Sequence, residues 1–179
     1  VLITLWNALE TIDEFFAKPL IFILPAYFFI TRSEKRPFLE SVGLHTKSPL
    51  LDIAIGLILG SVFFVVGMFG GKVTFQVSSS LLMWVPIAFA TSISEELISR
   101  GFVLNRLYEE SKNLITAPLY ASILYFFLTV PMIFTTPGFT GSILVKIMIM
   151  QVVLSLCLSF LYLYRRNIYA PVIVHALYL

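Results

Sequence analysis

The stretch that decides the fold is residues 81–106, which read LLMWVPIAFATSISEELISRGFVLNR. Its length suits a helix that crosses the hydrocarbon core of a membrane, roughly 30 Å thick, which needs about 20 apolar residues. Glu95, Glu96 and Arg100 interrupt the apolar run. Each charge near the middle of a bilayer costs about 2.5–3.5 kcal/mol. The stretch therefore predicts a membrane helix whose charges need stabilising partners or a functional role.

The composition of the whole chain points to the same environment. Its 179 residues are 59% hydrophobic and 12% charged, with a mean hydropathy of +0.95. A soluble domain carries about 25% charged residues, and a core of this size cannot bury the apolar excess. The 17 Phe and 8 Tyr exclude a disordered chain. A net charge of +2 without a basic stripe disfavours a nucleic-acid partner.

Apolar runs between short polar loops predict an all-α fold, a polytopic transmembrane helical bundle of about six membrane helices. We expect these helices at residues 17–31, 50–70, 81–108, 114–134, 142–164 and 168–179. Residues 1–18 have one apolar and one polar helical face, which predicts an interfacial helix or the tail of an earlier membrane span. No repeat or linker divides the chain, so residues 1–179 are expected to form a single domain.

If successive helices cross the bilayer in opposite directions, more basic residues lie on one side of the membrane than on the other. One side receives Arg32, Lys35, Arg36, Lys47, Arg106, Lys112, Arg165 and Arg166, and the other receives Lys18, Lys72 and Lys146. Because cytoplasmic loops carry an excess of Lys and Arg, the first side is assigned to the cytoplasm. We therefore expect an integral protein of the plasma membrane, surrounded by lipid, with its basic loops in the cytoplasm.

The three charges of the third helix differ in what can balance them. Glu96 and Arg100 are four residues apart, the spacing of an ion pair on one helical face. A purely structural role is an open interpretation of that pair. Glu95 lies about 100° further around the helix and lacks a local cation. An intramembrane carboxylate of that kind is typical of a proton relay, an ion site or a general base.

His175 is expected at the same depth as Glu95. At 1.5 Å per residue, Glu95 lies about 16 Å from the cytoplasmic edge near Arg106, and His175 about 14 Å from the edge near Arg166. The two side chains can therefore meet in one pocket, although an interhelical hydrogen bond is an open alternative for His175. Zinc needs three or four converging ligands and Cys157 is the only cysteine, so we expect no metal and no cofactor.

Two stretches resemble motifs of the CAAX-protease and bacteriocin-processing (CPBP, or Abi) family. Residues 95–107 match its first motif, Glu-Glu-xxx-Arg followed by Gly, an aromatic residue and Leu. Residues 164–176 are similar to its third motif and contain Pro-xxx-His, ending at His175. The resemblance implies an intramembrane glutamate-type endopeptidase that cleaves prenylated C-termini or small peptides, with a site open to the cytoplasmic side.

The same resemblance implies roles for the motif residues. Glu95 becomes the general base that activates water, Glu96 and Arg100 its supporting pair, and His175 an oxyanion donor. The second motif of the family is Phe-xxx-His, and here Tyr125 stands at the Phe and Thr129 at the His.

Leu179 stands where the family has an Asn that contacts the oxyanion. Losing a general-base partner or an oxyanion donor typically costs a factor of about 10² to 10⁴ in rate. Two hypotheses therefore stay open, an active endopeptidase and a catalytically impaired homologue that serves as a scaffold for a membrane protein partner. A transporter is disfavoured, because the chain has no paired halves with broken helices.

Overall fold

The computed structural model describes residues 13–45, 48–69, 81–135 and 140–179, which form helices and no strand. The first described helix is continuous through η1 (Asp13–Ala17), α2 (Lys18–Phe28) and η2 (Phe29–Ser33), and is followed by the short α3 (Phe38–Ser41). A second continuous helix comprises α5 (Leu81–Glu96), η3 (Leu97–Leu104) and α6 (Asn105–Ser111). The remaining helices are α4 (Pro49–Phe69), α7 (Thr116–Thr135), α8 (Gly141–Arg165) and α9 (Tyr169–Tyr178). The predicted all-α class is confirmed for these residues.

Three of these helices are long and apolar enough to cross a membrane. They comprise Phe15–Ser33, Pro49–Met68 and Gly141–Arg165. Two shorter apolar helices cover Thr116–Pro131 and Tyr169–Tyr178. The expected count of six membrane helices is therefore not confirmed. The helix predicted at 168–179 is ten residues long in the structure, or about 15 Å, which is half of a bilayer core. Most of the interfacial helix predicted at 1–18 lies outside the described residues.

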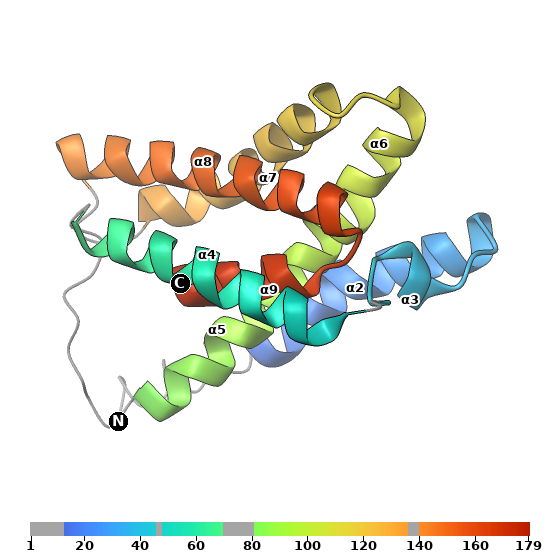
Figure 1. The fold of residues 1–179 in the computed structure, drawn as a ribbon, viewed down its shortest axis with the longest axis horizontal. Helices are drawn as coiled ribbons and strands as arrows, with labels where there is room; N and C mark the ends of the chain where they lie inside the picture. The colour runs from blue at the N-terminus through green and yellow to red at the C-terminus, as the bar shows by residue number, and fades with distance from the viewer. Residues whose placement is uncertain (1–12, 46–47, 70–80, 136–139) are drawn as a thin grey trace.

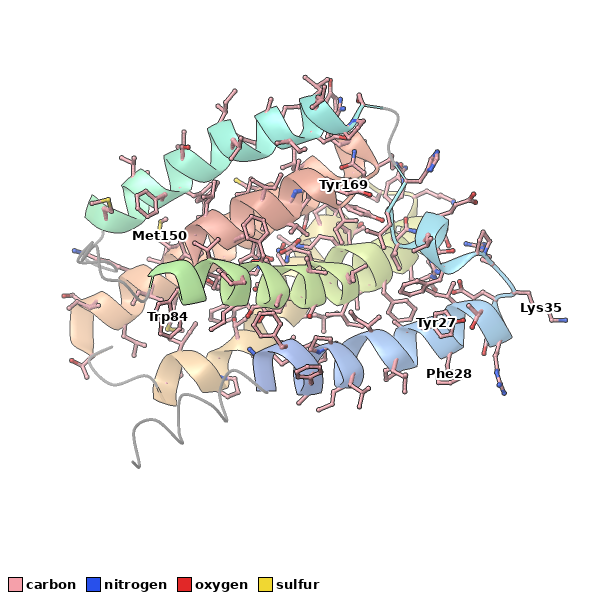
Figure 2. The ribbon with its side chains drawn as sticks, turned by 90° about the horizontal axis from the view of Figure 1, so that it is seen from below. Tyr27, Phe28, Lys35, Trp84, Met150 and Tyr169 are labelled. Atoms are coloured by element: carbon pink, nitrogen blue, oxygen red, sulfur yellow. The ribbon has the colours of Figure 1, made fainter. Side chains whose placement is uncertain are left out.

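The helix that contains α5 lies at the centre of the arrangement. It contacts α2 on one side and α9 on another, while α9 also packs against α4, and α7 packs against α8. Figure 2 shows α5 running between α2 and the pair formed by α4 and α9. Side chains on α5 and η3 can therefore reach partners on several other helices.

Two glycines of α4 let α9 approach closely. A Cβ atom on Gly56 would lie 2.8 Å from Ile173 Cβ, and one on Gly60 would lie 2.6 Å from Leu177 Cδ1. Gly67, further along the same helix, has no atom within 4 Å of such a position. Small residues at helix contacts are typical of membrane proteins. The contact between α4 and α9 fixes the helix that carries the candidate residue His175.

The connections that carry most basic residues lie at one end of the molecule. The segment after η2, the α6–α7 connection and the α8–α9 connection are all at this end (Figure 1). Lys35 projects away from the bundle there, whereas Trp84 and Met150 lie toward the opposite end (Figure 2). This arrangement agrees with the alternation of helices from which the topology was predicted.

A buried carboxylate anchors the basic end. Asp52 is fully buried at the start of α4. Its Oδ1 accepts a hydrogen bond from Arg165 Nε at 2.6 Å, and its Oδ2 accepts one from Asn167 Nδ2 at 2.9 Å. Arg165 Nη2 also donates to Ser48 Oγ at 2.9 Å. The turn that precedes α9 is therefore fixed to α4 by charge-assisted hydrogen bonds.

Candidate active site

The two carboxylates of the first motif are positioned by a change in helical winding. Glu95 and Glu96 end α5, and η3, which contains Arg100, continues the chain as a π-helix. Segments of this kind are frequent at functional sites, because they change the direction in which side chains project. Gly101 lets η3 pack directly on Val42, since a Cβ there would lie 2.9 Å from the Val42 carbonyl oxygen.

The predicted ion pair between Glu96 and Arg100 is confirmed. Arg100 Nη1 donates to Glu96 Oε1 at 2.7 Å, and the side chains are 1% and 0% exposed, respectively. Arg100 also donates to Ser99 Oγ at 2.9 Å and, from Nη2, to Ser155 Oγ at 2.8 Å. Ser155 lies on α8, so the guanidinium links that helix to η3. The charge of Arg100 is thus compensated and hydrogen-bonded inside the protein, as a buried charge requires.

His175 on α9 joins this pair. Its Nδ1 lies 2.8 Å from Glu96 Oε1, and its Nε2 lies 3.9 Å from Glu95 Oε2. A carboxylate paired with arginine only accepts hydrogen bonds, so the Nδ1 proton is assigned from this contact. His175 is buried. The expectation that His175 meets the Glu pair at one depth is therefore met by the contacts.

Glu95 is the more accessible of the two carboxylates. Its side chain is 12% exposed, whereas that of Glu96 is fully buried. Oε2 of Glu95 accepts a hydrogen bond from the Tyr125 hydroxyl at 2.7 Å, and Oε1 lies 3.9 Å from Lys18 Nζ. Glu95 is therefore the partly accessible carboxylate, while Glu96 belongs to the buried pair.

Tyr125 has a larger part in the cluster than its place in the second motif indicated. It is 3% exposed on α7, and its hydroxyl lies 3.3 Å from His175 Nε2 as well as beside Glu95. Arg100 Cζ lies 4.5 Å from the centre of its ring. Gln151 Nε2 on α8 donates to its hydroxyl at 3.5 Å. A tyrosine in place of phenylalanine was the available signal, because a buried hydroxyl normally requires a partner.

Lys18, predicted on the side opposite the basic loops, begins α2 at the end away from η2 and lies beside the cluster. The apolar run begins after Lys18, so the residue looked like the end of a membrane helix. In the structure the helix extends back through η1, and the ammonium group approaches Glu95. Glu95 thus has a cation nearby, supplied by a helix far away in the sequence.

The other two degenerate motif positions face elsewhere. Thr129 Oγ1 donates to the carbonyl of Phe126 at 2.9 Å, within its own helix. Leu179 is exposed, has no polar side-chain atom, and donates its backbone N–H to the His175 carbonyl. Neither side chain supplies the group that the family pattern has at its position.

The described part of the chain holds no group of three or more His, Cys, Asp and Glu side chains that could bind a metal ion. The expectation of a site without metal or cofactor stays a prediction.

Continuous contacts run from Arg100 through Glu96, His175 and Tyr125 to Glu95. They join α5, η3, α7 and α9, and the partly exposed end is a carboxylate. A carboxylate held by donors beside an imidazole can accept a proton from water.

A match to a protein-family model covers the helices that supply this cluster, apart from α2. A family model described as "Type II CAAX prenyl endopeptidase Rce1-like" matches residues 76–178, which is more than half of the chain. No curated protein and no solved structure matches the chain. Glu95, Glu96, Arg100, Tyr125 and His175 all lie within the matched residues, and Lys18 lies outside them.

Proposed function

The chain belongs to the type II CAAX prenyl endopeptidase Rce1-like family, and we propose that it is an intramembrane endopeptidase in which Glu95 activates the hydrolytic water. The observation that carries this proposal is the pairing of a partly exposed Glu95 with a buried His175 across 3.9 Å. The family implies a membrane protease with peptide or protein substrates. The proposed substrates are prenylated C-termini or small peptides.

The proposed reaction starts at Glu95. Its carboxylate takes a proton from water while the water oxygen attacks the scissile carbonyl carbon, and the carbonyl oxygen becomes an oxyanion. His175 stabilises that oxyanion, and donors placed at an oxyanion typically contribute a factor of about 10² to 10³ in rate. Collapse of the intermediate breaks the C–N bond, and the leaving amine takes up the proton that Glu95 removed from water, so that Glu95 is a carboxylate again.

Glu96 and Arg100 hold His175 in position in the proposed mechanism. Glu96 holds the imidazole through Nδ1, and Arg100 holds Glu96 and Ser155. A buried carboxylate, imidazole and guanidinium with several mutual hydrogen bonds keep one another in fixed orientations. Their proposed role is to present His175 Nε2 toward Glu95.

We also propose that residues 1–179 form one membrane domain of about six membrane helices in the plasma membrane. The continuous helix over residues 81–111 is about 46 Å long. Glu96 and Arg100 pair within it, and Glu95 contacts Tyr125 of α7 and lies near Lys18 of α2, which supports a crossing despite these three charges. The concentration of basic residues at one end supports a cytoplasmic position for that end.

Peptide cleavage by the purified full chain in lipid vesicles tests the proposed function. The first substrate is a peptide whose prenylated residue is followed by three C-terminal residues. The second is the same peptide without the prenyl group. We expect the wild type to release the tripeptide from the prenylated peptide and Glu95→Gln to release none. Glu110→Gln is the matched control, because Glu110 is exposed on α6, and it should retain the wild-type rate.

Thr129→His separates the two hypotheses from the sequence. It restores the imidazole that the second motif of the family has at this position. A wild type that cleaves nothing, with cleavage gained in Thr129→His, would contradict the proposed function and favour the impaired homologue. Co-purification of a membrane protein partner would then be the next measurement.

A further inference from the structure

The hydroxyl of Tyr125 lies close to two acceptors, and it can donate its single hydrogen to only one of them at a time. It is 2.7 Å from Glu95 Oε2 and 3.3 Å from His175 Nε2. A phenolic hydroxyl has one hydrogen to donate and lone pairs that accept. The shorter distance places that hydrogen on the bond to Glu95. Tyr125 can therefore donate to His175 only when it no longer donates to Glu95.

Whether His175 can donate to an oxyanion depends on which of its ring nitrogens carry a proton. Nδ1 donates to Glu96 Oε1, which also accepts from Arg100. A neutral imidazole with its proton on Nδ1 has a bare Nε2, and a bare nitrogen cannot donate to an oxyanion. His175 needs a second proton, at Nε2, before it can stabilise an oxyanion. The hydroxyl next to that nitrogen belongs to Tyr125.

We infer that Tyr125 relays the proton that Glu95 takes from water to Nε2 of His175, an inference that rests on the proposed function. Glu95 Oε2 passes its proton to the Tyr125 oxygen as the hydrogen of that hydroxyl moves to His175 Nε2. Glu95 returns to a carboxylate, Tyr125 remains neutral, and His175 carries N–H groups on both nitrogens. His175 then donates to the oxyanion and delivers this proton to the leaving amine.

The surroundings of Tyr125 suit a relay. The side chain is buried, and Gln151 donates to the same hydroxyl. The Arg100 guanidinium lies over the ring, where a cation is attracted to the aromatic face. These contacts hold the hydroxyl between its two acceptors. Thr129, at the position of the family imidazole, directs its own hydroxyl to Phe126.

Tyr125 acts through Glu95 and His175, so it is a positioning residue. The test removes only its hydroxyl, with Tyr125→Phe in the full chain in lipid vesicles. The matched control is Tyr120→Phe, because Tyr120 lies on the same helix and is 58% exposed. We expect Tyr125→Phe to lower kcat for the prenylated peptide by about 10² or more, with KM within about twofold. Tyr120→Phe should leave both constants unchanged.

The infrared spectrum of the Glu95 carboxylate provides a second measurement that needs no turnover. Its band is identified by its absence in Glu95→Gln. We expect the band to shift in Tyr125→Phe, because a hydrogen bond to the carboxylate is lost, and to stay in place in Tyr120→Phe. A role of Tyr125 in packing alone would leave the band unmoved.

The outcomes separate the relay from the proposed function. A Tyr125→Phe variant that cleaves at the wild-type rate while Glu95→Gln is inactive would overturn the relay and leave the proposed function intact. A band that does not move would also overturn the relay. Equal cleavage by wild type and Glu95→Gln, or none by the wild type, would overturn the proposed function together with the relay.

Discussion

Lys18 Nζ lies 3.9 Å from Glu95 Oε1, so the first described helix brings a cation to the candidate general base. The contact joins α2, outside the residues matched by the family model, to the first motif inside them. The Lys18 side chain is 23% exposed, and the distance is long for an ion pair. The interaction should therefore be weak, about 1 kcal/mol or less.

Lys18→Gln should lower kcat for peptide cleavage by no more than about fivefold, since about 1 kcal/mol corresponds to about a fivefold change in rate. Lys18→Arg should retain more activity, because it keeps the positive charge beside Glu95. Lys146→Gln, at an exposed lysine of α8, is the matched control. Equal kcat values for Lys18→Gln and Lys146→Gln would show that Lys18 has no part in the site.

Arg100→Met should destabilise the protein strongly. It leaves Glu96 buried without its cation, and breaking a buried ion pair typically costs about 3–5 kcal/mol. Arg100→Lys should recover only part of the loss, since one ammonium group cannot contact Glu96 and Ser155 as the guanidinium fork does. Thermal unfolding followed by circular dichroism in detergent measures the effect. Arg32→Gln, at an exposed arginine, should unfold at the wild-type temperature.

Gly56→Ala should weaken the contact between α4 and α9. The new methyl group would lie 2.8 Å from Ile173 Cβ, and overpacking of this kind costs about 1–3 kcal/mol. Gly67→Ala is the control on the same helix, where open space should make it neutral or stabilising by up to about 1 kcal/mol. Unfolding temperatures that fall equally in both variants would show that close packing at Gly56 is not the cause.

Cysteine labelling in intact cells tests the proposed orientation. Cys157 is first replaced by serine, and Glu40→Cys or Ser142→Cys is then introduced at exposed positions near opposite ends of the molecule. A membrane-impermeant thiol reagent should label Ser142→Cys from outside and Glu40→Cys only after the membrane is opened. The reverse pattern would contradict a cytoplasmic location of the basic loops.

Local spacing accounts for the parts of the site that could be predicted from the sequence. Glu96 and Arg100 are one turn apart, so their pairing follows from helix geometry alone. The meeting of His175 with the glutamates followed from counting residues to the nearest charged loops. Both predictions needed only the rise of a helix and the positions of charges.

The remaining contacts depend on how distant helices pack. Ser155 reaches Arg100 from α8, and Lys18 reaches Glu95 from α2. No residue pattern within α2 or α8 specifies these partners. The hydroxyl of Tyr125 could be noticed in the sequence as a departure from phenylalanine. Its position between Glu95 and His175 depends on the packing of α7 against α8 and η3.

Comparing Glu95→Gln with Glu96→Gln in the cleavage of a prenylated peptide, alongside thermal unfolding of both variants, tests directly whether Glu95 is the general base. Glu95→Gln should keep the wild-type unfolding temperature and release no tripeptide, because the partly exposed carboxylate of Glu95 is the proposed base. Glu96→Gln should unfold at a lower temperature, because it weakens the buried contacts to Arg100 and His175. Release of the tripeptide by Glu95→Gln at the wild-type rate would show that Glu95 is not the general base.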